Sequence, residues 1–202
     1  MKKNLVLYHS NCYDGFGAAY CAWLKLGACA DYVPVSYGYP PPDTSQYSDI
    51  YVLDFSYDAK EILELLKNHK VVLLDHHKTA EAKLGGLIDV QEPNLTLIFD
   101  MTKSGAMLAW EYFHRDYSGG DPLDSVPHAA PRLIEHIQDR DLWLYKIPGS
   151  REVHAALVSH PFSFIVWDQF NVDELISEGK ALIRMYASLV DNICKKPFMV
   201  KI

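Results

Sequence analysis

The sequence has 202 residues and a formal net charge of −7, with 49% hydrophobic and 22% charged residues. This length suits one domain with at most a small appendage, and the composition can supply an ordinary globular core. The acidic balance excludes a long basic groove for duplex DNA, but it leaves small phosphorylated ligands open because bound cations can invert the local field.

The first half of the chain alternates short apolar runs with helical patterns. Strand-like runs cover residues 5–8, 32–35, 50–53 and 71–74, and helical patterns cover 15–27 and 59–68. Runs that are apolar on both faces suit central strands of a parallel sheet, and Pro34 would confine its own run to an edge. Strand–helix–strand repetition implies right-handed crossovers. We therefore predict an α/β fold: a doubly wound, mostly parallel sheet with helices on both faces.

The second half is less regular and predicts mainly helix. Residues 95–99 form a further apolar run, and helical patterns cover 104–114, 131–138 and 172–194. Ser104 is a residue type that often caps a helix N-terminus. We expect an α/β domain over residues 1–145 and a C-terminal, mainly helical extension over 146–202.

Polar residues with metal-binding chemistry follow three of the predicted strands. They are His9, Asp54 and the triplet Asp75-His76-His77. In doubly wound sheets ligands bind beyond the carboxyl ends of the strands, so we expect these residues to meet at one edge. Imidazoles combined with carboxylates suit Mn²⁺, Fe²⁺, Co²⁺ or Zn²⁺ better than Ca²⁺. Neighbouring side chains on an extended chain point opposite ways, so the two histidines should have different roles.

The turn between the first strand and the first helix carries further candidates. It contains His9, Asp14, Gly15 and Gly17. The glycines let backbone come close to a ligand or a strand, and a helix start there offers N–H groups to an anion. An ordinary polar-capped turn is the competing interpretation, and the pairing of His9 with Asp14 favours ligation over it.

In order along the chain, these motifs resemble those of the DHH phosphoesterases, a family named for the Asp-His-His triplet found here at residues 75–77. A common form of the family's first motif, H-x-D-C-P-D-G-F, corresponds to HSNCYDGF at residues 9–16. The family's strand-end Asp matches Asp54, and its Ser/Thr-Gly turn matches Ser104. The segment DRDLW at residues 139–143 is similar to the D-x-D-x-W segment of the nano-RNase-like and oligoribonuclease-like branch, with the exopolyphosphatase-related branch as the alternative.

The resemblance, which covers residues 5–145, implies a DHH-type catalytic domain that binds two divalent cations, typically Mn²⁺. By that resemblance Asp54 bridges the two metals, and a bridging water or hydroxide attacks the phosphorus atom. The implied metal ligands are His9, Asn11, Asp14, Asp54, His76 and Asp139. The implied catalytic residues are Asp54, Asp75 and His77, of which His77 contacts the phosphoryl group. Asp141 is the alternative to Asp139.

One departure from the family pattern concerns the first metal. Asn11 stands where the family usually has Asp. An amide oxygen can bind a cation but adds no negative charge, so weaker binding is expected. In another register Cys12 takes this place, and a thiolate would favour a softer metal. Both alternatives stay open.

A second departure concerns substrate binding. The family's companion-domain motif, Gly-Gly-Gly-His, is missing from the sequence, since neither pair of adjacent glycines is followed by His. We expect the substrate to be held by a second subunit of a homo-oligomer or by residues of this chain: Ser104, Lys78, Arg140 and Arg151. The remaining histidines, among them His136 and His154, lack metal-binding spacing among themselves.

The expected activity is metal-dependent hydrolysis of a phosphodiester or phosphoanhydride bond in a small substrate, such as a short oligonucleotide or a nucleotide. An exopolyphosphatase or pyrophosphatase is the alternative enzyme. A degenerate member that binds a nucleotide without turnover is the non-enzyme alternative. An aromatic platform near the site would favour nucleotides.

The sequence also predicts a cytoplasmic protein with no membrane partner. The apolar run that ends before His9 is far too short for a signal peptide, and no apolar stretch approaches the roughly 20 residues that span a bilayer. The four cysteines contain no C-x-x-C pair, so we expect free thiols.

Overall fold

The computed structural model describes residues 4–88, 92–115 and 127–195. Its strands are β1 (Asn4–His9), β2 (Ala30–Val35), β3 (Asp49–Leu53), β4 (Lys70–Asp75) and β5 (Leu95–Phe99). They form one sheet in the order β2-β1-β3-β4-β5, in which every neighbouring pair is parallel. The predicted α/β class is therefore confirmed, and the strand that contains Pro34 lies at the edge, where a missing N–H is tolerated.

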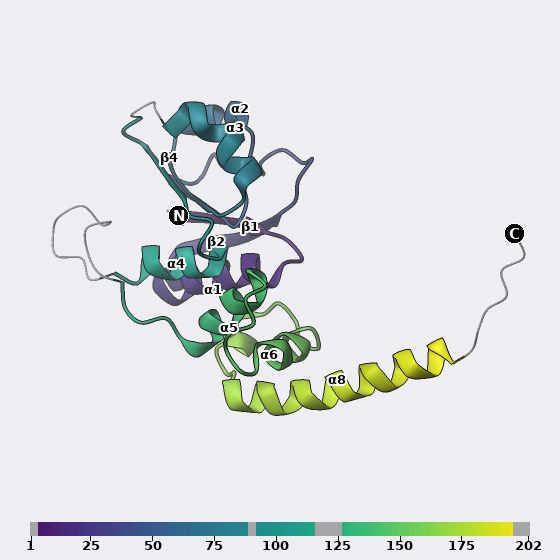
Figure 1. Ribbon diagram of the computed structural model, residues 1–202. Helices are drawn as coiled ribbons and strands as arrows, with labels where there is room; N and C mark the ends of the chain where they lie inside the picture. Colours follow the sequence, from purple (N-terminus) through teal and green to yellow (C-terminus); the bar gives the residue numbers. More distant parts are fainter. Residues whose placement is uncertain (1–3, 89–91, 116–126, 196–202) are drawn as a thin grey trace, which may run out of the picture.

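Helices cover both faces of the sheet (Figure 1). One face carries α1 (Tyr13–Leu26) and α4 (Gly105–Phe113), and the other carries α2 (Ala59–Leu66) and α3 (Lys78–Ile88). Side chains of a strand alternate between the faces, so Val6 joins the core under α1 whereas Leu5 and Leu7 join the core under α2. Because both cores need apolar side chains, the strands are apolar throughout.

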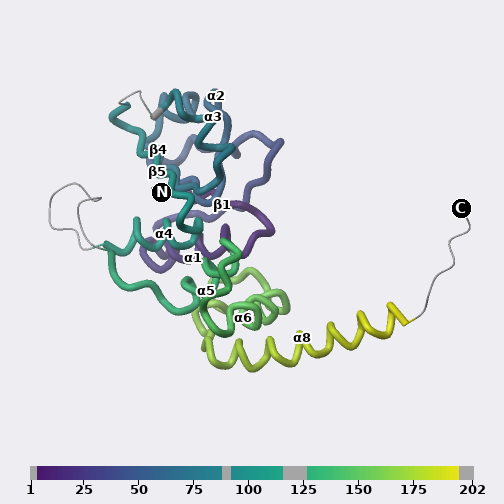
Figure 2. Tube along the Cα trace, in the orientation of Figure 1, coloured from purple at the N-terminus to yellow at the C-terminus, as the bar shows by residue number. Residues whose placement is uncertain are grey.

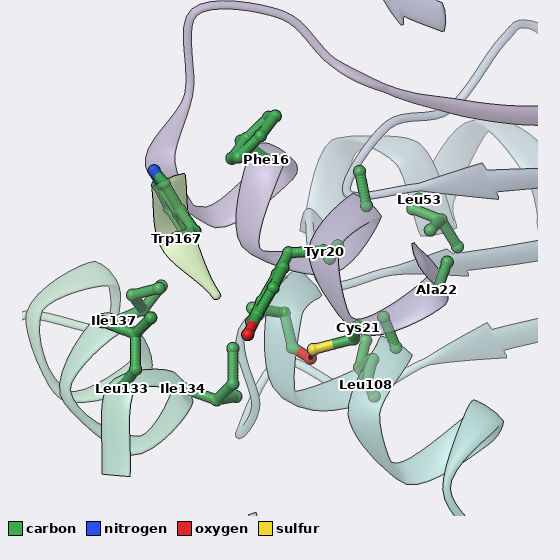
Figure 3. Close-up of a cluster of buried hydrophobic side chains, with 14 of the residues drawn as sticks. Phe16, Tyr20, Cys21, Ala22, Leu53, Leu108, Leu133, Ile134, Ile137 and Trp167 are labelled. Atoms are coloured by element: carbon green, nitrogen blue, oxygen red, sulfur yellow. Dashed lines mark hydrogen bonds between the residues drawn. The ribbon is translucent and has the colours of Figure 1, made fainter. Parts of the chain in front are cut away.

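The later helices form a further layer against α1 and α4 (Figures 1 and 2). They are α5 (Arg132–Asp141), α6 (Ser150–Leu157), α7 (Phe164–Trp167) and α8 (Val172–Cys194). A short 3₁₀ helix, η1 (Gly27–Cys29), lies earlier in the chain, between α1 and β2. Figure 3 shows Trp167 and Ile137 in one cluster with Phe16 and Tyr20 of α1. The predicted extension after residue 145 thus shares a core with the α/β part, and its last residues, 196–202, lie outside the described residues.

The long helix α8 is anchored at its start and runs past the body of the molecule (Figure 1). The Asn171 side chain caps it by accepting hydrogen bonds from the backbone N–H groups of Asp173 and Glu174. Gly179 is buried so closely against the Glu152 carbonyl of α6 that a Cβ would clash. Beyond Gly179 the helix exposes apolar side chains such as Leu189. Among the described residues, no helix combines the length and the apolar character that a membrane crossing requires.

The strand order creates a crevice at one edge of the sheet. The chain moves from β1 outward to β2 and then returns to the other side of β1 for β3. At such a switch point the connections diverge and leave room beyond the carboxyl ends of the two central strands. His9 ends β1 and Asp54 directly follows β3, so two of the predicted site residues lie at this crevice.

Candidate metal centre

Asp54 lies at the centre of the candidate site. It is 1% exposed, and its two carboxylate oxygens face different donor groups. Oδ1 lies 3.2 Å from Nε2 of His76. Oδ2 lies 3.6 Å from Nδ1 of His9 and accepts a 3.5 Å hydrogen bond from the Cys12 thiol. A carboxylate turned toward two groups in this way has the arrangement of a ligand shared between two cations.

The backbone around Asp54 is specialised for this position. Asp54 has a φ of 53°, a left-handed conformation that is uncommon for residues other than glycine. Asn11, on the neighbouring turn, has a φ of 52°. Such conformations cost on the order of 1–3 kcal/mol each and cluster at functional sites. A Cβ at Gly105 would lie 2.5 Å from Cβ of Asp54, so only glycine lets the start of α4 approach this closely.

A second group of ligand atoms surrounds Nε2 of His76. Besides Asp54, this nitrogen lies 3.5 Å from Oδ2 of Asp14 and 3.6 Å from Oδ2 of Asp141. Asp14 is buried and accepts hydrogen bonds from the backbone N–H groups of Gly105, at 2.6 Å, and Ala106, at 2.9 Å. These groups open α4, where the helix dipole stabilises negative charge. Asp14, His76 and Asp141 each offer one ligand atom within 4.8 Å of the others.

The crowding of carboxylates shifts the ionisation of the whole group. Burial raises the pKa of Asp14 well above its usual value, and the charges of Asp54 and Asp141 raise it further. Burial opposes charge on His76, but the three carboxylates around it raise its pKa to about 9. Burial likewise opposes charge on Asp54, yet hydrogen bonds to His76 and His9 lower its pKa to about 2. A divalent cation would relieve this concentration of buried negative charge.

His76 and His77 have different surroundings, as the alternation of side chains predicts. His76 is 11% exposed among the carboxylates, whereas His77 is 38% exposed. Nδ1 of His77 donates to Oδ1 of Asp75 at 2.6 Å, and His77 also offers a ligand atom within 4.8 Å of those of Asp54 and His76. Asp75 is fully buried and also accepts hydrogen bonds from Ser56 Oγ and from the backbone N–H groups of both histidines. Asp75 thus lies behind His77 and orients it.

The expectation that Asp139 lies in the cluster is wrong. Helix α5 continues through Asp141, three residues beyond the predicted end, so both aspartates are helical. Two residues on a helix are separated by about 200° around its axis, and the side chains therefore point to opposite sides. Asp139 accepts hydrogen bonds from Ser150 Oγ and from the backbone N–H groups of Lys146 and Ile147. Asp141 takes the place beside His76.

Cys12 and Asn11, the two alternatives for the ligand near His9, have different surroundings. The Cys12 thiol lies with His9 and Asp54, each offering a ligand atom within 4.8 Å of the others. Burial, followed by the charge of Asp54, raises the pKa of this thiol to about 12. Asn11 is exposed at the edge of the neighbouring pocket. The structure thus places the Cys12 thiol beside His9 and Asp54, and both Asn11 and Cys12 line the neighbouring pocket.

Of the four predicted substrate-binding residues, only Arg140 lines the pocket beside the cluster. The expectation for Ser104 is wrong, because this residue is fully buried and its hydroxyl caps α4 by accepting from the Met107 N–H. Lys78 is exposed at the start of α3. Arg151 is exposed on α6, with its guanidinium 4.4 Å from the centre of the Tyr145 ring.

The pocket has a volume of about 380 Å³ and opens directly onto the cluster. Asp14, Asp141 and His9 are shared between the cluster and the lining of the pocket, and further lining side chains come from α5 and α6. Among these are His136 and His154, which metal-binding spacing in the sequence did not single out. The spacing of His136 and Arg140, one helical turn apart, was the available signal that both share a face of α5.

No family model matches this sequence. The chain is 30% identical, over 216 aligned residues, to uncharacterized protein R106 of Acanthamoeba polyphaga mimivirus. The alignment covers 96% of this chain and 47% of the viral protein, so the chain spans about half the length of the curated relative it matches.

Proposed function

We propose that the chain is a metal-dependent phosphoesterase of the DHH type that holds two divalent cations, most suitably Mn²⁺. The observation that carries the proposal is Asp54, whose two oxygens face two separate groups of ligand atoms at the switch point of the sheet. His9 and Cys12 would hold one cation together with Asp54. Asp14, His76 and Asp141 would hold the other. The ordered sequence motifs support the same assignment.

The bound cations would supply an activated water and neutralise charge on the phosphoryl group. Hydrolysis would form a bond between a water oxygen and phosphorus and break the bond to the leaving oxygen, which would take up a proton from that water. As an imidazolium, His77 would donate from both ring nitrogens, from Nδ1 to Asp75 and from Nε2 to a phosphoryl oxygen. The carboxylate of Asp75 would stabilise this charged form and hold the ring in one orientation.

The substrate is a small phosphodiester or phosphoanhydride, for which the pocket beside the cluster has room. An exopolyphosphatase or pyrophosphatase would use the same ligand atoms and differs only in the leaving group. All four cysteines are free thiols, which supports the proposed cytoplasmic location.

The decisive experiment measures release of phosphate or mononucleotide by the purified protein with Mn²⁺. The substrates are a dinucleotide, a cyclic dinucleotide, tripolyphosphate and pyrophosphate. The test variant is Asp54→Asn, and the matched control is Asp173→Asn, a change at a 72% exposed residue of α8. We expect the unmodified protein to turn over substrate. Turnover should fall by at least about a hundredfold in Asp54→Asn and stay unchanged in Asp173→Asn.

Turnover that survives Asp54→Asn would refute the shared-ligand role. Absence of turnover with every substrate, together with Mn²⁺ binding that Asp54→Asn abolishes, would favour the degenerate nucleotide-binding alternative. Preference for tripolyphosphate or pyrophosphate over both nucleotides would identify the alternative enzyme.

A further inference from the structure

The pocket beside the candidate metal centre combines charged and apolar lining. It is lined by the carboxylates of Asp14 and Asp141, which also belong to the cluster. It is also lined by the apolar side chains of Val153 and Leu157, both about 1% exposed overall. A ligand with one phosphoryl end and one apolar end would match both kinds of lining.

Arg140 is the arginine that lines this pocket. Its position next to Asp141 brings positive charge to the edge of the cluster, and its charge also reaches His154. Within the described part of the chain, its Nε is buried without a hydrogen-bond partner. A guanidinium with free donors suits a phosphate oxygen or a sugar hydroxyl.

The two imidazoles that α5 and α6 contribute to the pocket, those of His136 and His154, are neutral groups and not further cations. Burial lowers the pKa of His136, whose Nδ1 lies 3.0 Å from Ser150 Oγ. Burial and the charge of Arg140 lower the pKa of His154 to about 4. A neutral imidazole offers one donor and one acceptor, together with a flat ring. These are features that recognise a heteroaromatic group better than a second phosphate.

The aromatic rings of Tyr13 and His154 add to the lining of the pocket. The ring of His154 packs edge-on against Tyr13, with 5.1 Å between the ring centres, and Tyr13 also contacts Phe162 at 5.0 Å. Aromatic faces bind nucleobases by stacking, which contributes on the order of 1–3 kcal/mol per base. An inorganic polyphosphate would leave these rings and the apolar side chains unused.

We infer that this pocket binds the terminal nucleotide of the substrate, with the phosphate at the metal centre and the base against His154, Tyr13 and Leu157. Arg140 is then a specificity-determining residue that holds the phosphate or sugar between the two ends. The inference rests on the proposed function and names its substrate class. The volume of about 380 Å³ lies at the small end of ligand pockets, which fits one nucleotide.

Calorimetric titration with AMP, ribose 5-phosphate and inorganic phosphate, each with Mn²⁺ present, separates the contributions of the base and of the phosphate. We expect AMP to bind at least about tenfold more tightly than ribose 5-phosphate, the gain that one stacked base provides. His154→Ala should reduce this ratio to about threefold or less, because it removes the ring but not the cluster. Arg140→Met should weaken all three ligands.

The matched control is Arg132→Met, which removes an arginine from the exposed face of the same helix. Arg132 pairs with Asp173 at 2.9 Å, and both side chains are more than half exposed. This variant should bind AMP like the unmodified protein. Circular dichroism and thermal unfolding would verify that each variant is folded.

Equal affinity for AMP and ribose 5-phosphate would overturn the inference, as would a ratio that His154→Ala leaves unchanged. Different results would refute the proposed function and the nucleotide pocket. A base preference that depends on His154 without turnover of any substrate would retain the pocket and refute the enzyme. Turnover that depends on Asp54 without a base preference would support the enzyme and refute the nucleotide pocket.

Discussion

Asp54 and Gly105 are in such close contact that no side chain fits between them. A Cβ at Gly105 would lie 2.5 Å from Cβ and 2.8 Å from Oδ1 of Asp54. The start of α4 is thereby placed against the carboxylate that faces both ligand groups, and its N–H groups hold Asp14. The glycine that opens this helix therefore helps to form the candidate metal centre.

Gly105→Ala should displace Asp54 and impair both metal binding and stability. We expect Mn²⁺ affinity to fall at least about tenfold, and the free energy of unfolding to fall by about 1–3 kcal/mol, the usual range for overpacking. Calorimetric titration and urea denaturation would measure the two effects.

Gly85→Ala is the matched control, because a Cβ there meets nothing within 4 Å. Alanine in that helix should leave metal binding unchanged and preserve or raise stability. Equal Mn²⁺ affinity in both variants would contradict the role of the close contact.

Replacing Asp141 and Asp139 should have separable effects. Asp141→Asn should weaken Mn²⁺ binding by about tenfold or more with little loss of stability, because it removes a charge from the cluster. Asp139→Asn should mainly lower stability, by about 1–3 kcal/mol, because its carboxylate accepts three hydrogen bonds from the segment that leads into α6. Metal titrations and denaturant unfolding of both variants test this. A larger loss of metal affinity in Asp139→Asn would show that Asp139 is the ligand.

The two histidines of the triplet should differ in what their loss removes. His77→Ala should leave Mn²⁺ affinity within about threefold of the original and lower kcat by about a hundredfold or more, because only a contact to the phosphoryl group is lost. His76→Ala should lose Mn²⁺ affinity itself, because Nε2 lies among three carboxylates. Parallel metal titration and steady-state kinetics would separate these effects. An equal loss of Mn²⁺ affinity in both variants would contradict the substrate-facing role of His77.

The identity of the ligand near His9 can be read from the spectrum of the Co²⁺-loaded protein. If the Cys12 thiolate binds Co²⁺, a sulfur-to-metal charge-transfer band should be present in the near ultraviolet, and Cys12→Ser should remove it. Cys29→Ser is the matched control, since Cys29 is an exposed free thiol outside the cluster. Asn11→Asp tests the other register. A spectrum without the band, combined with tighter Mn²⁺ binding by Asn11→Asp, would assign the ligand to position 11.

Much of the fold could be predicted because strand and helix patterns are local. The strand-like runs at residues 5–8 and 71–74 coincide with β1 and β4, and their apolar character on both faces follows from two cores. The polar residues that end these runs could likewise be placed at one edge, since parallel strands share their carboxyl ends.

The sequence by itself thus determined the parallel sheet and the gathering of His9, Asp54 and His76 at its edge, because strand alternation and chain direction decide both. Only the tertiary structure decided between Asp139 and Asp141, because that choice depends on how far α5 continues and on the angle between residues around its axis. The pocket likewise required the tertiary structure. Tyr13 and His154 are far apart in sequence, and they meet only because α6 packs into the same core as α1.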